Sequence, residues 1–435
     1  MSELGPSPLA AGDKNLSVAQ AREAIAAALR PITQAEDLPV DQALGRVLAV
    51  DVISPIDVPA HDNSAMDGYA FDGRALRQDG PTLLRSVGTL MAGAPYGGTV
   101  GTGDCLRIMT GAVMPTGLDT VVPLELCRSE GSLVHVEAGV IRAGENRRRR
   151  GEDLAAGRPA VQAGRFLKPA DMGLIASLGV ERVPVFRRLR VALFSTGDEI
   201  RTLGQPLDPG CVYDSNRYSL MGALQRLGME VVDLGLVRDD PQALHSVLEQ
   251  ATARADAVVT SGGVSMGDAD HTRDVLAQRG QVAFWKVAMR PGRPFAFGPL
   301  RRSASADGST ADVAGAQAPV WLFALPGNPV AALVTFYVFA REALLSLAGA
   351  TATPLPVLQA RCLTPIRKRP GRTEFQRAIV EPAVGGGWQV RLFGSQGAGV
   401  LRSMSEANAL VVLGHEQASV AAGDLVDVWL FDGLT

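Results

Sequence analysis

The hydrophobic residues of this chain repeat with two different periods, and the pattern changes along its length. Between residues 189 and 350, short apolar runs alternate with segments of helical periodicity, which is typical of a doubly wound α/β domain. The runs that predict its main strands are residues 190–194, 230–234, 257–260 and 320–325. Residues 282–288 and 294–298 predict two more strands around a turn that contains Arg290 and Arg293.

The flanking regions have a different texture. Glycine and proline punctuate short alternating segments in residues 56–140, which predicts a β-rich domain inserted in the chain. A similar pattern in residues 355–435 predicts a small C-terminal β-barrel. Helical and connecting stretches in residues 1–55 and 141–188 form a discontinuous N-terminal helical and linker domain. The predicted fold class is therefore multidomain α/β plus β, with the α/β domain over residues 189–350.

Composition excludes several classes of function. The chain has 435 residues, of which 46% are apolar and 20% charged, and its net charge is −3, so nothing global indicates nucleic-acid or membrane binding. Residues 147–150 form the one dense basic run, and the acids that follow favour an anion-contacting turn. Four scattered cysteines indicate neither a zinc site nor a disulfide framework. Because the N-terminus lacks a signal pattern, we expect a cytoplasmic protein.

Polar or glycine-rich sequence follows each predicted strand of the α/β domain. In an open α/β sheet, ligands bind outside the carboxyl ends of the strands, so these loops predict one site. In chain order they supply Ser195, Thr196, Gly197 and Glu199; Asp239; Ser261, Gly262, Gly263, Val264 and Ser265; and Pro326, Gly327, Asn328 and Pro329. Glycines let the backbone turn its N–H groups toward an anion, although Ser-Gly-Gly also occurs in ordinary turns.

Charged residues near these loops suggest which ligand the site takes. The loops place Glu199, Asp239, Asp268 and Asp270 around one crevice. Carboxylates repel a phosphate ester unless a cation bridges them, so the pattern implies Mg²⁺. Lys286 and the turn that contains Arg290 and Arg293 supply positive charge for a second anion.

Two further stretches lie in the β-rich domain. Residues 61–70 are small and acidic, and such runs most often form an Asx-turn connector; the other interpretation is a polar loop that presents Asp67 to a site. Thr110, in a small-residue loop after a strand, is a candidate contact to a phosphate or hydroxyl group.

These stretches together resemble one family, the molybdopterin molybdenumtransferases, which include the bacterial MoeA proteins and the E domain of gephyrin. The matching segments are residues 62–70, 107–111, 148–153, 195–199, 261–265, 295–298 and 325–330. The resemblance implies a four-part subunit and a homodimer whose active site joins the central domain of one chain to the β-rich domain of the other. It also implies the reaction: adenylylated molybdopterin and molybdate give molybdenum cofactor and AMP in the presence of Mg²⁺, with molybdopterin adenylyltransferase as the upstream partner.

The resemblance also assigns residues, and it favours the functional interpretation of the Asp67 loop. Its acidic cluster falls on Asp67, Asp153, Glu199, Asp239 and Asp270, with Thr110 beside them. Three of these acids, Glu199, Asp239 and Asp270, are the expected Mg²⁺ ligands. Its molybdate-side group falls on Lys286, Arg290 and Arg293, and a contact from the C-terminal domain falls on Arg377.

The sequence departs from the family at two places. Arg290 and Arg293 stand where the family commonly has lysines, which keeps the charge but replaces a compact ammonium with a planar fork. Ala398 stands where a serine is often found, which removes a hydroxyl.

Three alternatives stand beside this prediction. The molybdopterin adenylyltransferase resembles the central domain alone, and the match over the flanking β domains argues against it. A non-catalytic molybdopterin-binding scaffold uses the same fold, and a variant that inserts tungstate would use the same residues.

Overall fold

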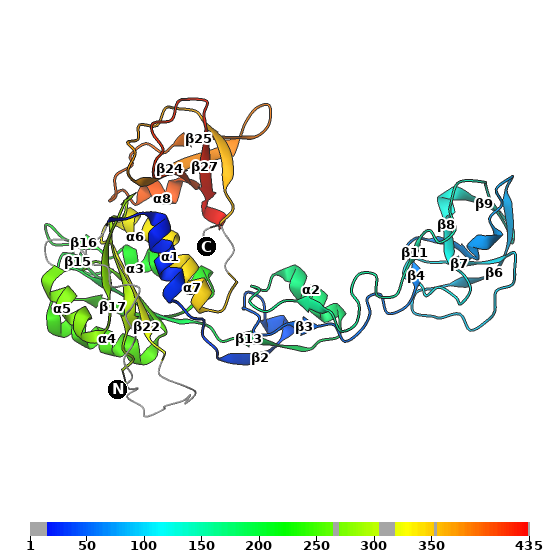
Figure 1. The fold of residues 1–435 in the computed structure, drawn as a ribbon, viewed down its shortest axis with the longest axis horizontal. Helices are drawn as coiled ribbons and strands as arrows, with labels where there is room; N and C mark the ends of the chain where they lie inside the picture. Colours follow the sequence, from blue (N-terminus) through cyan, green and yellow to red (C-terminus); the bar gives the residue numbers. More distant parts are fainter. Residues whose placement is uncertain (1–14, 264–268, 304–317, 352–354, 434–435) are drawn as a thin grey trace. The chain divides into compact units, whose positions relative to one another are not determined.

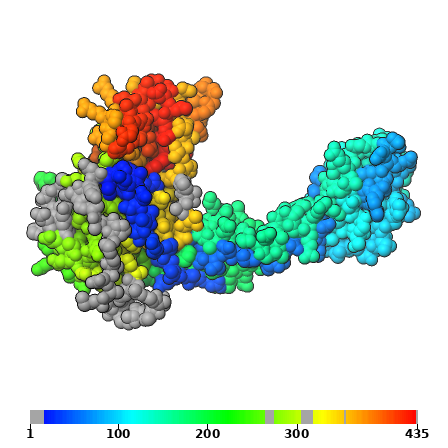
Figure 2. Space-filling model, in the orientation of Figure 1, coloured from blue at the N-terminus to red at the C-terminus, as the bar shows by residue number. Residues whose placement is uncertain are grey.

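The computed structural model describes residues 15–263, 269–303, 318–351 and 355–433, and only the backbone of residues 269–273. The chain forms two compact units, whose segments can be followed by colour in Figures 1 and 2. The first unit consists of residues 1–36, 45–49 and 185–435, and the second of residues 37–44 and 50–184. Each unit has its own hydrophobic cores.

The first unit is built on a seven-stranded sheet. In spatial order its strands are β1 (Asn15–Leu16), β19 (Ala283–Val287), β21 (Pro294–Leu300), β22 (Val320–Leu325), β18 (Ala257–Ser261), β14 (Arg190–Thr196) and β17 (Glu230–Val237). The four strands from β22 to β17 are parallel to one another, and β21 is antiparallel to both of its neighbours. This arrangement confirms the predicted α/β domain.

Helices cover both faces of the sheet, as Figure 1 shows. On one face lie α4 (Pro241–Arg254) and α5 (Ala269–Arg279); on the other lie α1 (Val18–Ala28), α3 (Asn216–Arg226), α6 (Pro329–Thr335) and α7 (Arg341–Leu347). Strand β14 serves both layers: Val191 and Leu193 belong to the α1 side, and Ala192 and Phe194 to the α4 side. Successive side chains of a strand point to opposite faces, which is why a strand covered on both sides is apolar throughout.

The helix starts next to the sheet edge are set by local sequence. Asp240 caps α4 by accepting hydrogen bonds from the backbone N–H groups of Gln242 and Ala243, and Pro241 occupies the first turn. Ser17 and Gln20 form a reciprocal capping box at the start of α1. Because α4 begins directly after the loop of β17, its cap also fixes the end of that loop.

One long apolar helix, Pro329–Leu347, consists of α6, the π-helical stretch η4 (Phe336–Ala340) and α7. It has 19 residues and a mean hydropathy of 1.7, so by length and composition it could cross a membrane. However, 72% of the most apolar 18-residue stretch of this helix is buried inside the protein, as in a helix of a hydrophobic core. In Figure 2 the N-terminal helix α1 (blue) lies beside it, and Arg22 of α1 forms an ion pair with Glu342.

The C-terminal part of the first unit is a closed five-stranded barrel. Around the barrel the strands are β24 (Thr373–Pro382), β25 (Trp388–Leu392), β23 (Leu358–Cys362), β27 (Leu425–Leu430) and β26 (Ala409–Leu413), and β26 pairs back to β24. The short strand β20 (Met289–Arg290) joins this barrel through β24, and α8 (Arg402–Glu406) lies between β25 and β26 in the chain. The barrel confirms the C-terminal fold predicted from the sequence.

The second unit contains a six-stranded sheet. In spatial order its strands are β8 (Thr120–Pro123), β5 (Gly68–Phe71), β7 (Asp104–Ile108), β6 (Thr82–Leu90), β10 (Leu133–Val136) and β9 (Cys127–Glu130). The unit also contains the short strands β3 (Val52–Ile53), β4 (Asn63–Ser64), β11 (Arg147–Arg148) and β12 (Pro159–Val161) and the α-helix α2 (Pro169–Ser177). The sheet confirms the predicted β-rich domain.

Candidate functional site

Four loops leave the same edge of the seven-stranded sheet. In the register of the parallel strands, Ser195 of β14 lies opposite Ser261 of β18, and Ser261 lies opposite Leu325 of β22. On the other side of β14, Thr196 lies opposite Val237, the last residue of β17. The four strand ends are therefore neighbours, and the loops that follow them start side by side.

Acidic side chains lie in two of these loops. The backbone N–H of Asp239 donates to a carboxylate oxygen of Asp198 at 3.3 Å, which joins the β17 loop to the β14 loop. Glu199 and Asp239 are both exposed. The carboxylate of Glu199 folds back over Gly197, since a Cβ built on that glycine would lie 2.7 Å from Glu199 Oε2. Side chains from the β14 and β17 loops thus lie in one patch at the carboxyl edge of the sheet.

The predicted metal ligands are described only in part. Asp270 lies in the first turn of α5, but its side chain is outside the described residues, as is all of Asp268. Among the side chains that the structure describes, no three His, Cys, Asp or Glu residues are grouped closely enough to hold a metal ion. Glu199 and Asp239 nevertheless suit Mg²⁺, because this ion is commonly held by one or two carboxylates together with substrate phosphates.

The glycine loop after β18 packs tightly against β14. Gly262 has φ +96°, and a Cβ there would lie 2.3 Å from the backbone oxygen of Thr196. Its N–H donates to the oxygen of Leu325 at 3.2 Å, so this amide is not available to a phosphate. The predicted role of Gly262 therefore changes from anion donor to close packing, and in the described part of this loop the N–H of Gly263 remains the candidate anion donor. Val264 and Ser265 lie outside the described residues.

The two described serines of the predicted site, Ser195 and Ser261, are buried, with hydroxyl groups bonded inside the protein. Ser195 donates to Asp214 at 3.0 Å, and Ser261 receives a hydrogen bond of 2.6 Å from Asn216. Any contact of Ser195 or Ser261 with substrate must therefore come from the backbone. Thr196 differs, because its buried hydroxyl has no partner in the described part of the chain.

Sequence reasoning missed a buried polar group at the start of α3. Asp214, Asn216 and Arg217 are each at most 8% exposed. Arg217 binds Asp214 at 3.0 Å and Asp233 at 2.5 Å, so two carboxylates compensate its buried charge. An Asp-Ser-Asn run before a helix looks the same as ordinary capping residues, so the residue pattern contains no separate signal for this group.

The loop after β22 is partly exposed. Gly327 and Asn328 are exposed, Pro326 is buried, and Pro329 starts α6. The turn between β20 and β21 packs on the same helix, because a Cβ on Gly292 would lie 2.2 Å from Thr335 Oγ1. Arg290 and Arg293, on either side of that turn, are exposed.

Lys286 lies opposite Pro294 at the base of this turn, and Arg377 lies on β24 of the barrel. Trp285 and Val287 belong to the core on the α1 side, so Lys286, half-buried between them on β19, points to the opposite face of the sheet. Arg377 is 1% exposed, and burial, with the positive charge of Arg290 adding to it, lowers the pKa of Arg377 to about 10.

The guanidinium of Arg377 is used inside the barrel. It donates to Ser403 Oγ at 3.0 Å, to Ser395 O at 3.2 Å and to Gly397 O at 2.9 Å. The next residue, Ala398, accepts a hydrogen bond of 3.0 Å from the N–H of Val330 in α6. Arg377 therefore holds a barrel turn against the start of α6, next to the β22 loop, rather than presenting its charge to solvent.

Two of the predicted acidic residues, Asp67 and Asp153, lie in the second unit. Asp67 is exposed, and one of its oxygens accepts hydrogen bonds from the N–H and the hydroxyl of Thr110 at 2.7 and 2.8 Å. These bonds lower the pKa of Asp67. Asp153, also exposed, forms an ion pair with Arg148. The structure thus brings Asp67 and Thr110 together, as their common assignment to one site requires.

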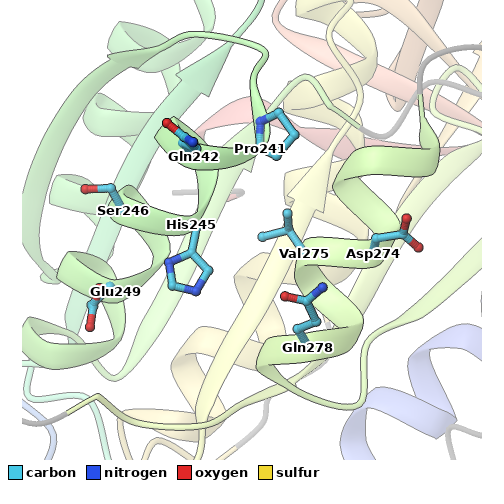
Figure 3. Close-up of a pocket in the computed structure, with 8 residues that line it drawn as sticks. All are labelled: Pro241, Gln242, His245, Ser246, Glu249, Asp274, Val275 and Gln278. Carbon is cyan, nitrogen blue, oxygen red and sulfur yellow. The ribbon is translucent and has the colours of Figure 1, made fainter.

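A separate groove lies between α4 and α5. It has a volume of about 410 Å³ and, as Figure 3 shows, is lined mainly by polar side chains of the two helices. Its lining residues are Pro241, Gln242, His245, Ser246, Glu249, Asp274, Val275 and Gln278. None of the predicted site residues belongs to this set, and the groove offers no glycine backbone to an anion.

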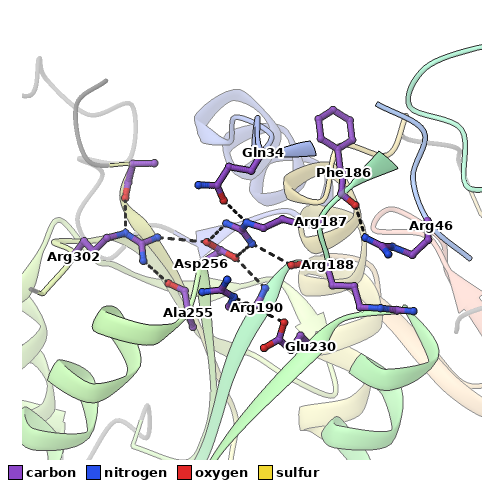
Figure 4. A network of polar contacts seen from close by, with 11 residues as sticks. Gln34, Arg46, Phe186, Arg187, Arg188, Arg190, Glu230, Ala255, Asp256 and Arg302 are labelled. Carbon is purple, nitrogen blue, oxygen red and sulfur yellow. Dashed lines mark hydrogen bonds and ion pairs between the residues drawn. The ribbon is translucent and has the colours of Figure 1, made fainter. Parts of the chain in front are cut away.

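The opposite edge of the sheet is held by Asp256. Its carboxylate receives two hydrogen bonds from Arg187, at 2.7 and 2.8 Å, and one from the N–H of Arg190 at 2.9 Å, while Arg302 lies 3.5 Å away (Figure 4). Burial raises the pKa of Asp256, but these hydrogen bonds and charges outweigh it, so the net pKa is lowered. The network fixes the starts of β14 and β18, and with them the relative positions of their far ends.

Comparisons with known proteins cover nearly the whole chain. Three family models match in order: the MoeA N-terminal region (domain I and II) over residues 16–179, a probable molybdopterin binding domain over residues 192–346, and the MoeA C-terminal region (domain IV) over residues 359–431. A molybdopterin molybdenumtransferase of Haemophilus influenzae is 37% identical over 422 residues, which are 96% of this chain and 99% of that protein.

Other relatives agree with this result. Molybdopterin molybdenumtransferase 2 of Mycobacterium tuberculosis is 36% identical over 415 residues, which cover 92% of this chain and 95% of its own. A crystal structure of the molybdopterin biosynthesis MoeA protein from Pyrococcus horikoshii superimposes with a TM-score of 0.78 at 25% identity, covering 96% of this chain and 100% of that one.

Proposed function

The chain belongs to the MoeA family, the molybdopterin molybdenumtransferases of molybdenum cofactor biosynthesis, and we propose that it converts adenylylated molybdopterin and molybdate into molybdenum cofactor and AMP with the help of Mg²⁺. One observation carries the proposal: four loops of the α/β domain begin side by side at the carboxyl edge of the sheet. Ligands of open α/β sheets bind at this edge.

The diphosphate of the substrate fits the centre of this edge. Gly262 lets the β18 loop approach β14 closely, so the N–H of Gly263 can face a phosphate oxygen without a side chain in between. Gly327, on the neighbouring loop, is also exposed and has no Cβ. Two loops that leave backbone uncovered next to each other suit a phosphate group better than an apolar ligand.

Glu199 and Asp239 would hold the Mg²⁺ ion, with Asp270 as a third candidate. When bound, the ion would neutralise the negative charge that develops on the two phosphates during cleavage. Without a cation, both carboxylates would repel the diphosphate, so their exposed position beside the glycine loop is consistent with a metal-dependent site. The bond from Asp239 to Asp198 keeps the two loops at one spacing.

Arg290 and Arg293 would hold the oxyanion. They are exposed on a turn that packs against α6, and the Arg377 turn of the barrel meets the same helix. Guanidinium groups bind tetrahedral oxyanions through paired N–H donors. Tungstate has the same charge and nearly the same size as molybdate, so tungstate insertion is the alternative reaction that this turn supports.

We also propose a homodimer in which the Asp67–Thr110 pair of one chain completes the site of its partner. Asp67 and Thr110 are exposed and already joined by two hydrogen bonds. In addition, the segment that follows Glu199 carries several exposed apolar side chains. They are Leu203, Leu207, Val212 and Tyr213, which are 42–54% exposed. Such a run favours a protein–protein interface.

The setting of the reaction follows from the same assignment. We propose that the protein acts in the cytoplasm, binds neither nucleic acid nor membrane, and receives its substrate from molybdopterin adenylyltransferase. The net charge of −3 and the burial of the Pro329–Leu347 helix support this setting.

AMP release tests the proposed reaction. The purified protein is incubated with adenylylated molybdopterin, Mg²⁺ and either molybdate or tungstate, and AMP is followed by chromatography. The proposal requires AMP formation that depends on Mg²⁺ and is lost in Glu199→Gln. A non-catalytic scaffold would bind the pterin substrate but release no AMP, and the response to the two oxyanions separates molybdate from tungstate insertion.

A further inference from the structure

The first turn of α3 lies directly beneath the strand ends of the candidate site. Asp214 accepts a hydrogen bond from Ser195 at the end of β14. Two residues later, Asn216 reaches the end of β18 and the loop after β22. One short segment, residues 214–217, therefore contacts two of the strand ends and one of the loops of the candidate site.

Asn216 makes the most direct link between two of the loops. Its Nδ2 donates to Ser261 Oγ and to Gly327 O, each at 2.6 Å, and the residue is 8% exposed. A side-chain amide nitrogen has two hydrogens, so each loop receives one. Ser261 extends the link by donating to Pro326 O at 3.3 Å. The β18 and β22 loops are thus tied together twice through buried polar groups.

We propose that Asn216 is a positioning residue for the phosphate of the substrate: its amide sets the spacing between the β18 loop, which ends in Gly263, and the β22 loop, which carries Gly327. The inference rests on the proposed function, because the phosphate site is defined there. The packing supports it, since the Cβ position of Gly327 lies only 3.8 Å from Gly262 Cα, so the two backbones have little freedom to close further. If the amide is removed, the hydrogen bond from Ser261 to Pro326 O and the one from the Gly262 N–H to Leu325 O still join the loops, but the only described bond that reaches Gly327 is lost.

The side chain of Asn216 also contains an acceptor atom that neither loop uses. Its Oδ1 is buried and has no partner in the described part of the chain. Buried polar atoms are nearly always satisfied by protein or by ordered water, so a water or ligand donor at this atom is expected. An asparagine satisfies both loops and keeps this acceptor, whereas aspartate would set a negative charge against Gly327 O and the incoming phosphate.

The test measures the affinity for AMP, the proposed product, rather than activity alone. Isothermal titration of AMP in the presence of Mg²⁺ is carried out on wild type, Asn216→Ala, Ser261→Ala and the double variant. We expect the Kd for AMP to rise on the order of tenfold in Asn216→Ala, because a change of this size corresponds to the loss of one good hydrogen bond. Because Asn216 acts partly through Ser261, the double variant should bind hardly more weakly than Asn216→Ala.

Asn408→Ala is the matched control. Asn408 also bridges backbone groups through its amide, donating to Val380 O and accepting from Val380 N, both at 2.9 Å, but it does so inside the barrel. This variant should lose stability without changing the Kd for AMP. All titrations are run well below the melting temperature of each variant, so global unfolding does not enter the comparison.

The titrations can overturn the positioning role of Asn216 in three ways. A Kd for Asn216→Ala within twofold of wild type overturns the positioning role, and so does an equal rise in Asn408→Ala. If Asn216→Ala does not fold, Ser261→Ala still breaks the same bond from the other side, and an unchanged Kd in that variant overturns the inference. A wild-type protein that neither binds AMP nor releases it from substrate instead refutes the proposed function itself.

Discussion

Replacing Gly262 with alanine probes the tightest point of the candidate site. The residue has φ +96°, and the new Cβ would lie 2.3 Å from the oxygen and 2.8 Å from the hydroxyl of Thr196. The left-handed conformation costs an alanine about 1 kcal/mol, and relieving the overlap with a buried backbone oxygen costs roughly 1–3 kcal/mol more. We therefore expect Gly262→Ala to lose about 2–4 kcal/mol of unfolding free energy.

Alanine substitutions at two other glycines separate the conformational cost from the cost of the steric overlap. Gly204 has φ +84° with no atom within 4 Å of the Cβ position, so Gly204→Ala should show the conformational cost alone, about 1 kcal/mol. Gly327 meets only Gly262 Cα at 3.8 Å, so Gly327→Ala should change stability by less than about 0.5 kcal/mol.

Urea unfolding followed by tryptophan fluorescence gives the three values, and titration with AMP reports on the site. Gly262→Ala should also bind AMP more weakly than Gly204→Ala, because the carbonyl of Thr196 must move away from the loop. If Gly262→Ala proves no less stable than Gly204→Ala, Gly262 does not pack closely against Thr196 in solution. The proposed phosphate site, which depends on that packing, is then wrong.

Three further predictions follow from named contacts. Asp67→Asn keeps an acceptor for both bonds from Thr110 but removes the charge, so the melting temperature should stay near that of wild type while AMP release falls on the order of 100-fold; near-normal turnover would contradict the assignment. Asp256→Asn leaves Arg187 without its buried partner and should lower the unfolding free energy by about 3 kcal/mol at pH 7, measured by urea unfolding. Because the folded pKa of Asp256 is lowered, its stabilising contribution is present above about pH 4 and disappears as the pH falls through the folded value, so the variant should show a flatter acid limb than wild type. Arg290→Ala should raise the molybdate concentration needed for half-maximal AMP release about tenfold and leave the Kd for AMP unchanged; an equal effect on both ligands would place Arg290 at the phosphate instead.

The sequence predicted those features that depend on local periodicity. Strands of the α/β domain are apolar along their whole length because both faces are covered, and each ends where polar or glycine residues begin. Ser195 and Ser261 mark two such ends, and the rule that ligands bind there pointed to the edge of the sheet at which the structure brings the loops together. The caps of α1 and α4 were likewise visible, because Ser17 and Asp240 act through residues two or three positions away.

Features that depend on contacts between distant segments could not be predicted. Asn216 looks like a residue near a helix cap, and only the fold brings it to Gly327, 111 positions later in the chain. The amide of Gly262 was expected to face an anion, but the pairing of β18 with β22 uses it. Arg377 was expected to contact a ligand, whereas its burial and its three acceptors in the barrel are tertiary properties that no local pattern records.

A crystal structure of the protein with AMP and Mg²⁺ tests the central claim most directly. The phosphate should lie within hydrogen-bonding distance of the Gly263 backbone, between the β18 and β22 loops, with the metal ion on the same side as Glu199 and Asp239. A phosphate bound elsewhere, for example in the groove between α4 and α5, or a metal ion that contacts neither Glu199 nor Asp239, would contradict the account.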